Sequence, residues 1–226
     1  MFFTAVWLKS TLTAAMTTSS AAPLRTTGRV LHWAARYDLL VWLLTHGRDR
    51  AFRETLIGLA GLAPGESVLD VGCGTGSLAI AARRRVGTGG EVLGVDASPE
   101  MIARAASKAA RAGVGVSFRN AVAEALPFPD ARFDVVLSTL MLHHLPRPAR
   151  QQCAREIRRV LKPGGRALVV DFARSPDRKS LLGHFHRHGH VDPRDLVSLL
   201  EDAGLRIGES GPVGVSSLQY VVAVPR

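Results

Sequence analysis

The stretch DVGCGTGSLAI, residues 70–80, decides the fold. It joins a short apolar run, SVLDV at 67–71, to an alanine-rich segment, and glycines stand at the alternate positions 72, 74 and 76. A short apolar run that ends at a glycine is typical of a strand buried on both faces. Glycine allows a tight turn and a close approach between the backbone and a ligand. The stretch therefore predicts a strand, a ligand-binding turn, and a helix that begins near residue 76.

Strand and helix patterns alternate along the chain from residue 67 to residue 205. Further strands are predicted at 91–96, 116–120, 133–138, 166–172, 205–210 and 217–224, and helices at about 76–86, 98–112, 147–161 and 192–204. Ser98-Pro99 marks a helix start and Pro163-Gly164-Gly165 a helix stop. Alternation of this kind builds a doubly wound, mostly parallel sheet with helices on both faces. The predicted fold class is α/β with seven strands.

The part of the chain before residue 62 divides in two. Residues 1–28 end in a Ser/Thr/Ala-rich stretch and are expected to be a disordered tail. From 29 to 61, apolar residues that include Trp33 recur at helical spacing and predict an N-terminal helical addition. The expected organisation is a tail at 1–28 and one domain at 29–226, in which helices at 29–61 precede a core at 62–226.

Composition narrows the class of protein. The 226 residues are 46% hydrophobic, which suits one globular domain, and the net charge is +10. The basic residues are scattered along the chain, which argues against a nucleic-acid partner. Two distant cysteines, Cys73 and Cys153, imply no disulfide framework and favour a reducing cytoplasm. No apolar run reaches the roughly 18 residues of a membrane-spanning helix, and contact with a membrane surface remains an alternative.

The glycine turn is expected to bind a nucleoside that carries a positive charge. In an open α/β sheet, ligands bind beyond the carboxyl ends of the strands. Asp96 ends the second predicted strand, 20 residues after Gly76, where a carboxylate can accept from both ribose hydroxyls. The spacing departs from the G-x-G-x-x-G of dinucleotide sites, because the third glycine is Gly76 and the next residue is Ser77. Asp70 would repel a pyrophosphate but suits an ammonium group.

Four motifs resemble those of class I S-adenosylmethionine-dependent methyltransferases, in order and spacing: VLDVGCGTG, GVDASPEMI, AEALPFPDARFDVV and RVLKPGGRALVVDF. The resemblance covers about residues 30–224 and implies a Rossmann-like core with S-adenosylmethionine as the cofactor. It implies that the amino-acid end of the cofactor contacts the glycine turn, at Asp70, Gly72, Cys73, Gly74 and Gly76. It implies that Asp96 binds the ribose, and that Ala97, Met101 and Ala123 lie beside the adenine.

One position departs from this family's pattern. Such sequences commonly read G-D-A-E-A-L-P-F, whereas this chain has Val122 at the place of the acid that would accept from the adenine amino group. The backbone N–H of Ala123 is still expected to meet the ring. Losing one hydrogen bond costs roughly 0.5–1.5 kcal/mol, so the resemblance implies weaker adenine recognition.

The candidate catalytic residues follow the fourth predicted strand, in STLMLHHLPR at 138–147. His143 and His144 are adjacent, so their side chains are expected to diverge and only one to face the acceptor; either could instead orient the loop. Asp171 ends the fifth predicted strand and could face the pocket or bond the backbone. The [N/D]-P-P-[Y/F] sequence of enzymes that methylate amide or base nitrogens is missing here, which leaves a small-molecule or lipid-like acceptor.

Two further segments bear on the acceptor. ARYDLLVWLLTHGRDRAFRE, residues 35–54, resembles the start of ubiquinone/menaquinone-biosynthesis C-methyltransferases, which implies that Tyr37 lies near the cofactor. HFHRHGH, residues 184–190, is interpreted as a loop over the acceptor in which His186 and His188 are candidate substrate-binding residues. No Cys or paired carboxylate stands near these histidines, so no metal is expected.

The sequence thus predicts an enzyme that transfers a methyl group from S-adenosylmethionine, by in-line displacement, to a small-molecule or lipid/quinone-like acceptor. Two alternatives remain. An RNA or protein methyltransferase would use the arginines as a docking surface. A noncatalytic partner subunit would bind the cofactor without transferring a methyl group. Both a monomer and a homodimer fit the sequence.

Overall fold

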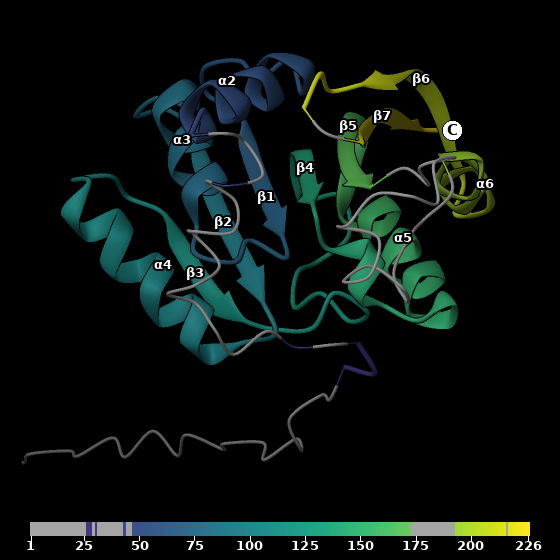
Figure 1. Cartoon of the computed structure of the whole chain (residues 1–226), viewed down its shortest axis with the longest axis horizontal. Coiled ribbons are helices and arrows are strands. Elements are labelled where there is room, and N and C mark those ends of the chain that lie inside the picture. The colour runs from purple at the N-terminus through teal and green to yellow at the C-terminus, as the bar shows by residue number, and fades with distance from the viewer. Residues whose placement is uncertain (1–25, 29, 31–42, 44–46, 173–192, 216) are drawn as a thin grey trace, which may run out of the picture.

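The computed structural model describes residues 26–28, 30, 43, 47–172, 193–215 and 217–226 (Figure 1). The predictions for Tyr37, His186 and His188 lie outside these residues. The elements, in chain order, are α2 (Asp49–Leu59), β1 (Ser67–Val71), α3 (Ser77–Val86), β2 (Glu91–Asp96), α4 (Pro99–Arg111), β3 (Ser117–Asn120), β4 (Phe133–Thr139), the 3-10 helix η1 (Leu142–His144), α5 (Arg147–Val160), β5 (Leu161–Phe172), α6 (Pro193–Asp202), β6 (Leu205–Pro212) and β7 (Leu218–Pro225).

The strands form one seven-stranded sheet in the order β3-β2-β1-β4-β5-β7-β6 (Figure 1). Strands β1 to β5 pair in parallel, and β7 lies antiparallel between β5 and β6. The predicted α/β fold with a mostly parallel sheet is therefore confirmed. The strand order reverses between β1 and β4, so the carboxyl ends of these two strands form the crevice in which such sheets bind ligands.

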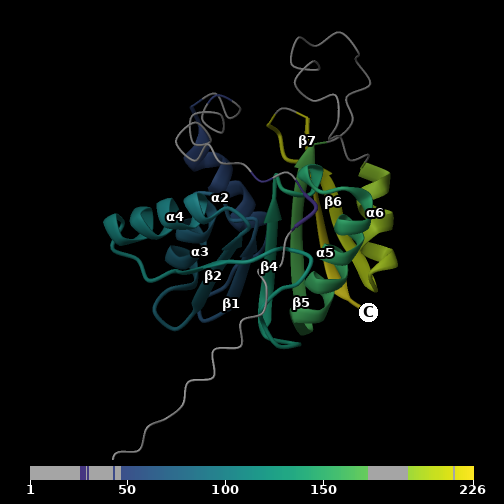
Figure 2. The ribbon, with the colours of Figure 1, turned by 90° about the horizontal axis from the view of Figure 1, so that it is seen from below.

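Helices cover both faces of the sheet, as predicted (Figure 2). Successive residues of a strand point to opposite faces, and β1 shows this directly. Val68 packs with buried side chains of α2 and α3, and Leu69 packs with those of α5 and α6. Both side chains are fully buried, so the sheet separates two apolar cores.

The boundary between α5 and β5 differs from the prediction. The helix ends at Val160 and the strand begins at Leu161, so Pro163-Gly164-Gly165 lies inside the strand element and not before it. Helical conformation is disfavoured for the residue before a proline, here Lys162, so the helix ends before that residue. The three residues are accommodated where the pairing of β4 with β5 shifts register, and Gly164 has a φ of +79°.

Helix α2 is the described part of the predicted N-terminal helical addition. Its side chains Phe52, Leu56 and Ile57 are buried against the sheet face that also carries α3. Arg166 of β5 donates to the carbonyl oxygens of Ala60 and Gly61 at the end of this helix. Among the described residues, no helix is long and apolar enough to cross a lipid bilayer.

Candidate functional site

The glycine turn after β1 lies against the end of β2. The backbone N–H groups of Gly72 and Cys73 both donate to the Val95 carbonyl oxygen, at 2.8 and 2.9 Å. Gly72 has a φ of +73°, and a β-carbon built there would lie 2.4 Å from Cγ of Met141. A residue with a side chain would therefore be strained and would push Met141 away. The turn exists in this form because the sequence places glycine there.

Asp96 holds this turn from the tip of β2. Its Oδ2 accepts a hydrogen bond from the Gly74 N–H, and its Oδ1 accepts one from the Ser98 N–H, both at 2.9 Å. Burial raises the pKa of this carboxyl group. The two bonds fix the plane of the carboxylate and leave each oxygen with capacity for one further donor, as a pair of vicinal hydroxyls would supply.

Asp70 is a buried acid without a hydrogen-bond partner. Only 1% of the residue is exposed, and neither carboxylate oxygen makes a hydrogen bond to any described residue. The Ala79 N–H in the first turn of α3 is close enough to stabilise the charge somewhat, but it does not complete a hydrogen bond. Burial and the charge of Asp96 raise the pKa of Asp70 to about 7. Unpaired buried polar groups are rare, and this one fits a ligand that brings its own cation.

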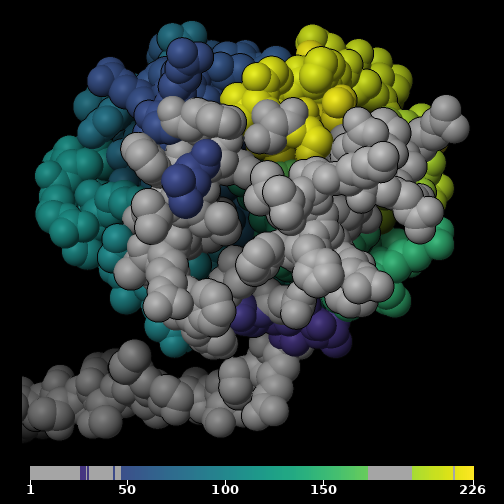
Figure 3. Space-filling view, viewed as in Figure 1, coloured from purple at the N-terminus to yellow at the C-terminus, as the bar shows by residue number. Residues whose placement is uncertain are grey.

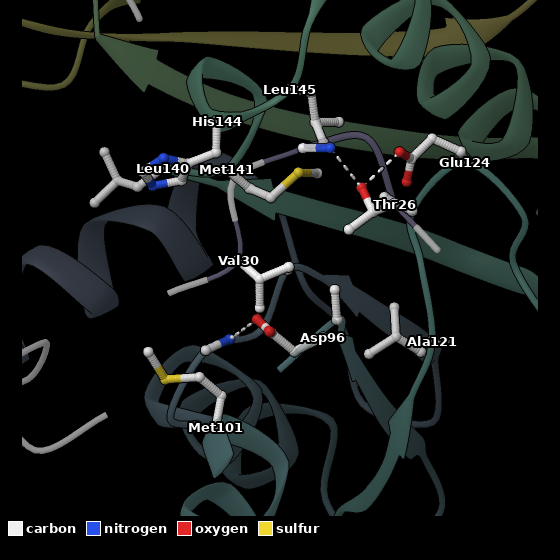
Figure 4. A pocket seen from close by; sticks show the side chains of 16 residues that line it. Thr26, Val30, Asp96, Met101, Ala121, Glu124, Leu140, Met141, His144 and Leu145 are labelled. Carbon is white, nitrogen blue, oxygen red and sulfur yellow. Dashed lines mark hydrogen bonds between the residues drawn. The ribbon is translucent and has the colours of Figure 1, made fainter. Parts of the chain in front are cut away.

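A pocket opens at the carboxyl ends of β1, β2 and β4 and encloses about 660 Å³, part of it open to solvent. In Figure 4, Asp96 and Met101 lie on one side of it, and Met141, His144 and Leu145 lie on the other. The predicted residues that line it are Gly72, Gly74, Asp96, Ala97, Met101 and Ala123. The structure thus brings together residues from the first three sequence motifs.

A second, wider hollow adjoins this pocket on the side of α2 and encloses about 1930 Å³, much of it open to solvent. Gly72 and Leu140 border both hollows. The predicted residues Asp70 and Cys73 line the second hollow, with apolar side chains of α2 and α3 that include Phe52, Leu56 and Leu78. The two hollows therefore meet at the ends of β1 and β4.

The surroundings of two predicted cofactor residues, Gly76 and Cys73, indicate a role in packing. Gly76 lines neither hollow, and a β-carbon there would lie 2.7 Å from the Phe118 ring and 2.8 Å from Ala105, so it serves the packing of α3 on α4 and β3. Cys73 and Cys153 are both buried and free. Burial raises the pKa of Cys73 well above its ordinary value, which disfavours the thiolate that a nucleophile requires.

The expectation that His143 and His144 diverge is wrong. Their ring centroids lie 3.9 Å apart with the planes tilted by 47°. The reason is that these residues form the 3-10 helix η1, in which neighbouring side chains do not alternate as they would in an extended segment. His144 lines the pocket, whereas Nδ1 of His143 lies 2.7 Å from Oδ1 of Asp171.

Sequence reasoning missed several residues of the pocket wall. One of these residues is Glu124, whose Oε1 accepts a hydrogen bond from the Thr26 hydroxyl at 2.7 Å (Figure 4). Its Oε2 is enclosed and has no hydrogen bond to a described residue. Thr26, Gly28 and Val30 also line it, and the short purple segment that contains them lies at the lower margin of the body in Figure 3. A contact between residues 98 positions apart leaves no periodic signal in the sequence.

Leu140 is a second missed position. It follows β4 with a φ of +55°, a left-handed conformation that is unusual for leucine, and its N–H donates to the Val170 carbonyl oxygen at 2.8 Å. This turn carries the chain across the ends of the strands and directs Met141 over Gly72. Strained backbone of this kind is concentrated at binding sites.

Comparison with known proteins agrees with this geometry. Residues 68–165 match the family model described as "Methyltransferase domain". A ubiquinone/menaquinone biosynthesis C-methyltransferase of Azotobacter vinelandii is 40% identical over 152 residues, which are 66% of this chain and 58% of that protein. A demethylmenaquinone methyltransferase of Thermus thermophilus is 41% identical over 154 residues, 68% of each chain. The chain thus spans between about half and two thirds of these relatives' length.

Solved structures support the same relationship. A crystal structure of an S-adenosylmethionine-dependent methyltransferase from Aquifex aeolicus superposes with a TM-score of 0.70 at 26% sequence identity. The alignment covers 84% of this chain and 97% of that one, so the similarity extends well beyond the residues of the family model.

Proposed function

The chain belongs to the class I S-adenosylmethionine-dependent methyltransferase family, as its motifs predicted, and on this premise we propose that it methylates a small, apolar, quinone-like acceptor. One observation carries the cofactor part of the proposal: a buried carboxylate without a partner, Asp70, lies across a glycine turn from a second carboxylate, Asp96, that is oriented by two backbone N–H groups. A ligand with an ammonium group at one end and a ribose at the other satisfies both.

The amino-acid end of the cofactor is assigned to the junction of the two hollows. Asp70 is the counter-ion for its ammonium group, and Gly72 allows the backbone to approach it. Asp96 accepts from the ribose hydroxyls, with Ala97 and Met101 beside the adenine. S-adenosylmethionine, when bound, supplies a methyl group on a sulfonium, which an acceptor can attack in line. The protein's part is to align the acceptor and exclude water.

The acceptor is assigned to the wider hollow, whose walls combine apolar side chains with both basic and acidic ones. Phe52, Leu56 and Leu140 supply apolar surface, and Arg50 and Arg84 lie at its border. This lining suits a flat, largely apolar molecule with polar substituents. The quinone names of the relatives support the same class of acceptor. His186 and His188 remain predicted contacts of the acceptor, and Tyr37 remains a predicted contact of the cofactor.

The proposal is tested with a defined acceptor. The purified protein is incubated with methyl-labelled S-adenosylmethionine and a short-chain demethylmenaquinone that has been chemically reduced to the quinol. We expect labelled menaquinone, and no label on transfer RNA or on added protein in parallel reactions. Label on RNA or protein alone would replace this proposal with the macromolecular alternative. Cofactor binding without any transfer to the quinol or to cell extract would favour a noncatalytic subunit.

Affinity for S-adenosylmethionine is expected to rise with pH up to about 7 and then level off. With the pKa of Asp70 at about 7, the acid is largely protonated below that pH and offers no counter-ion to the ammonium group. Affinity should fall by up to about tenfold for each pH unit below the pKa. Titration calorimetry over this range measures it. Asp70→Asn should bind weakly with no such slope, and Asp202→Asn, an exposed acid on α6, should behave as the wild type.

The raised pKa of Asp70 makes the stability of the cofactor-free protein fall as the pH rises, which is opposite to the trend in cofactor affinity. The pKa of Asp70 is raised on folding from an ordinary 3.8, so the folded state binds a proton more tightly than the unfolded state. Its contribution to stability is therefore lost as the pH rises from about 4 to about 7. Saturating cofactor should reduce this loss, and thermal unfolding with and without cofactor measures the difference.

A further inference from the structure

We propose that His143 and Asp171 form a proton-accepting pair, in which His143 is the general base and Asp171 is its positioning residue, and that the methyl acceptor therefore carries an acidic hydroxyl group. This inference rests on the proposed methyl transfer and specifies its acceptor. The two residues come from different strand ends: His143 from η1 after β4, and Asp171 from the end of β5.

The pair is held by several contacts at once. Nδ1 of His143 lies 2.7 Å from Oδ1 of Asp171, and the backbone N–H of His143 donates to Oδ2 at 3.0 Å. The Phe172 N–H also donates to Oδ1, at 2.8 Å. Because a carboxylate oxygen only accepts, the ring proton must be on Nδ1. This arrangement selects one tautomer and leaves the other ring nitrogen, Nε2, with a lone pair.

The Nε2 atom of His143 is not fully enclosed by the described residues. It has no hydrogen bond to a described residue and is not one of the enclosed polar atoms that lack a partner. The His143 side chain is 12% exposed, whereas that of Asp171 is 1% exposed, so the pair is buried at its acid end and accessible at the imidazole. This is the arrangement expected of a base that reacts with a ligand and not of a pair that serves packing alone.

Two aromatic rings pack against the imidazole of His143. The Phe172 ring meets it edge-on with centroids 5.2 Å apart. On another side, the His144 ring lies 3.9 Å away, and His144 lines the pocket. His143 itself lines neither hollow; it lies one ring behind His144, on the segment that begins with Leu140 at the junction of the two hollows. The proposal therefore requires the acceptor hydroxyl to enter this junction beside His144 to reach Nε2.

The titratable and charged groups near His143 and Asp171 belong to β5, η1, α5 and α6. Asp171 belongs to β5 and His144 to η1. On α5, Arg150 donates through Nε to the carbonyl oxygens of Leu142 and Leu145, both at 2.8 Å, which holds the two ends of η1. Burial lowers the pKa of Arg150, and the negative charges of Asp171 and of Asp195 in α6 oppose that lowering. The base therefore has one carboxylate in direct contact, and the charge of Arg150 interacts with that carboxylate.

The pair takes a proton from the acceptor before the methyl group is transferred. The O–H bond of the acceptor breaks, and its proton forms a bond to Nε2 of His143. The electron pair left on oxygen makes that oxygen, or the ring carbon conjugated with it, a stronger nucleophile toward the methyl group. The methyl–sulfur bond breaks with its electrons staying on sulfur, and the proton passes from the imidazolium to solvent. For methylation at carbon, that carbon's own proton leaves and the hydroxyl is restored. Proton removal of this kind contributes about 10²–10⁴-fold in rate.

The first part of the test needs no acceptor. In protein labelled with ¹⁵N-histidine, NMR of the ring nitrogens should show His143 protonated at Nδ1. Asp171→Asn should lose this preference, and Asp202→Asn, the same change on an exposed side chain, should keep it. A proton on Nε2 in the wild type would overturn the inference, whatever the acceptor.

The second part measures methyl transfer to the short-chain demethylmenaquinol and to the organic-soluble acceptor of a cell extract. His143→Gln should lower kcat about 100-fold or more with cofactor affinity within about twofold, and Asp171→Asn should lower kcat less. With the cofactor saturating at every pH, the wild-type kcat should fall at low pH, where an imidazolium cannot accept a proton, and His143→Gln should lose this dependence. If His143→Gln kept the wild-type activity and pH profile, the proposed role of His143 and Asp171 would be wrong. The proposed function would stand, because the wild type would still transfer methyl groups. A wild type that transfers to neither acceptor would refute the proposed function and, with it, this inference.

Discussion

Replacement of Asp96 by alanine is expected to lower affinity for S-adenosylmethionine by at least about 100-fold. A hydrogen bond to a charged group contributes about 1.5–3 kcal/mol, and two ribose hydroxyls make two such bonds. Every 1.4 kcal/mol is about tenfold in affinity, so two bonds give about 10²–10⁴-fold. The substitution also removes the acceptor for the Gly74 N–H, which loosens the glycine turn on the amino-acid side of the site.

Titration calorimetry with S-adenosylmethionine and S-adenosylhomocysteine measures this effect. Asp202→Ala is the matched control, because it removes an exposed carboxylate at the end of α6, outside both hollows. Thermal unfolding without cofactor separates a binding defect from a folding defect. Wild-type affinity in a folded Asp96→Ala variant would mean that the ribose does not bind here, and the site assignment would be wrong.

Substitution of Gly76 by alanine should strongly destabilise the folded protein. The residue has a φ of +75°, which costs a residue with a side chain roughly 1–2 kcal/mol. The new β-carbon would also lie within 3 Å of the Phe118 ring and of Ala105, and overpacking of this kind typically costs about 1–3 kcal/mol. Together they predict a loss of about 2–5 kcal/mol in the free energy of unfolding.

Gly113 supplies the control for that measurement. Its φ is +65°, but no atom lies within 4 Å of the β-carbon that alanine would add. Gly113→Ala should therefore show the conformational cost alone, and the difference between the two variants isolates the packing of Phe118 and Ala105. Equal losses in urea unfolding would show that the close contacts carry no energy. The packing account of Gly76 would then fail.

Much of the fold could be predicted because local signals agreed. SVLDV, the glycine turn and Ser98-Pro99 each specify their own element by composition within a few residues. The Pro163-Gly164-Gly165 segment was the exception, since the shift in register that accommodates it depends on the partner strand β4. A local stop signal cannot reveal that the same residues also pair in a sheet.

The site divides in the same way. Asp70, Gly72, Gly74 and Asp96 were found because motif spacing places them at strand ends. The contact of His143 with Asp171 spans 28 residues, and that of Thr26 with Glu124 spans 98. These contacts depend on how separate elements meet in three dimensions. No spacing rule within one segment could show which of two adjacent histidines meets an acid and which lines the pocket.

The most direct test of methyl transfer to an apolar small molecule uses labelled cofactor and no assumption about the acceptor. The purified protein is incubated with methyl-tritiated S-adenosylmethionine and cell extract, which is then separated into organic-soluble, small polar and macromolecular fractions. Asp96→Ala is run in parallel as the inactive control. We predict label in the organic-soluble fraction with the wild type and not with the variant. Label confined to the macromolecular fraction would contradict the account and assign the +10 net charge to the binding of RNA or protein.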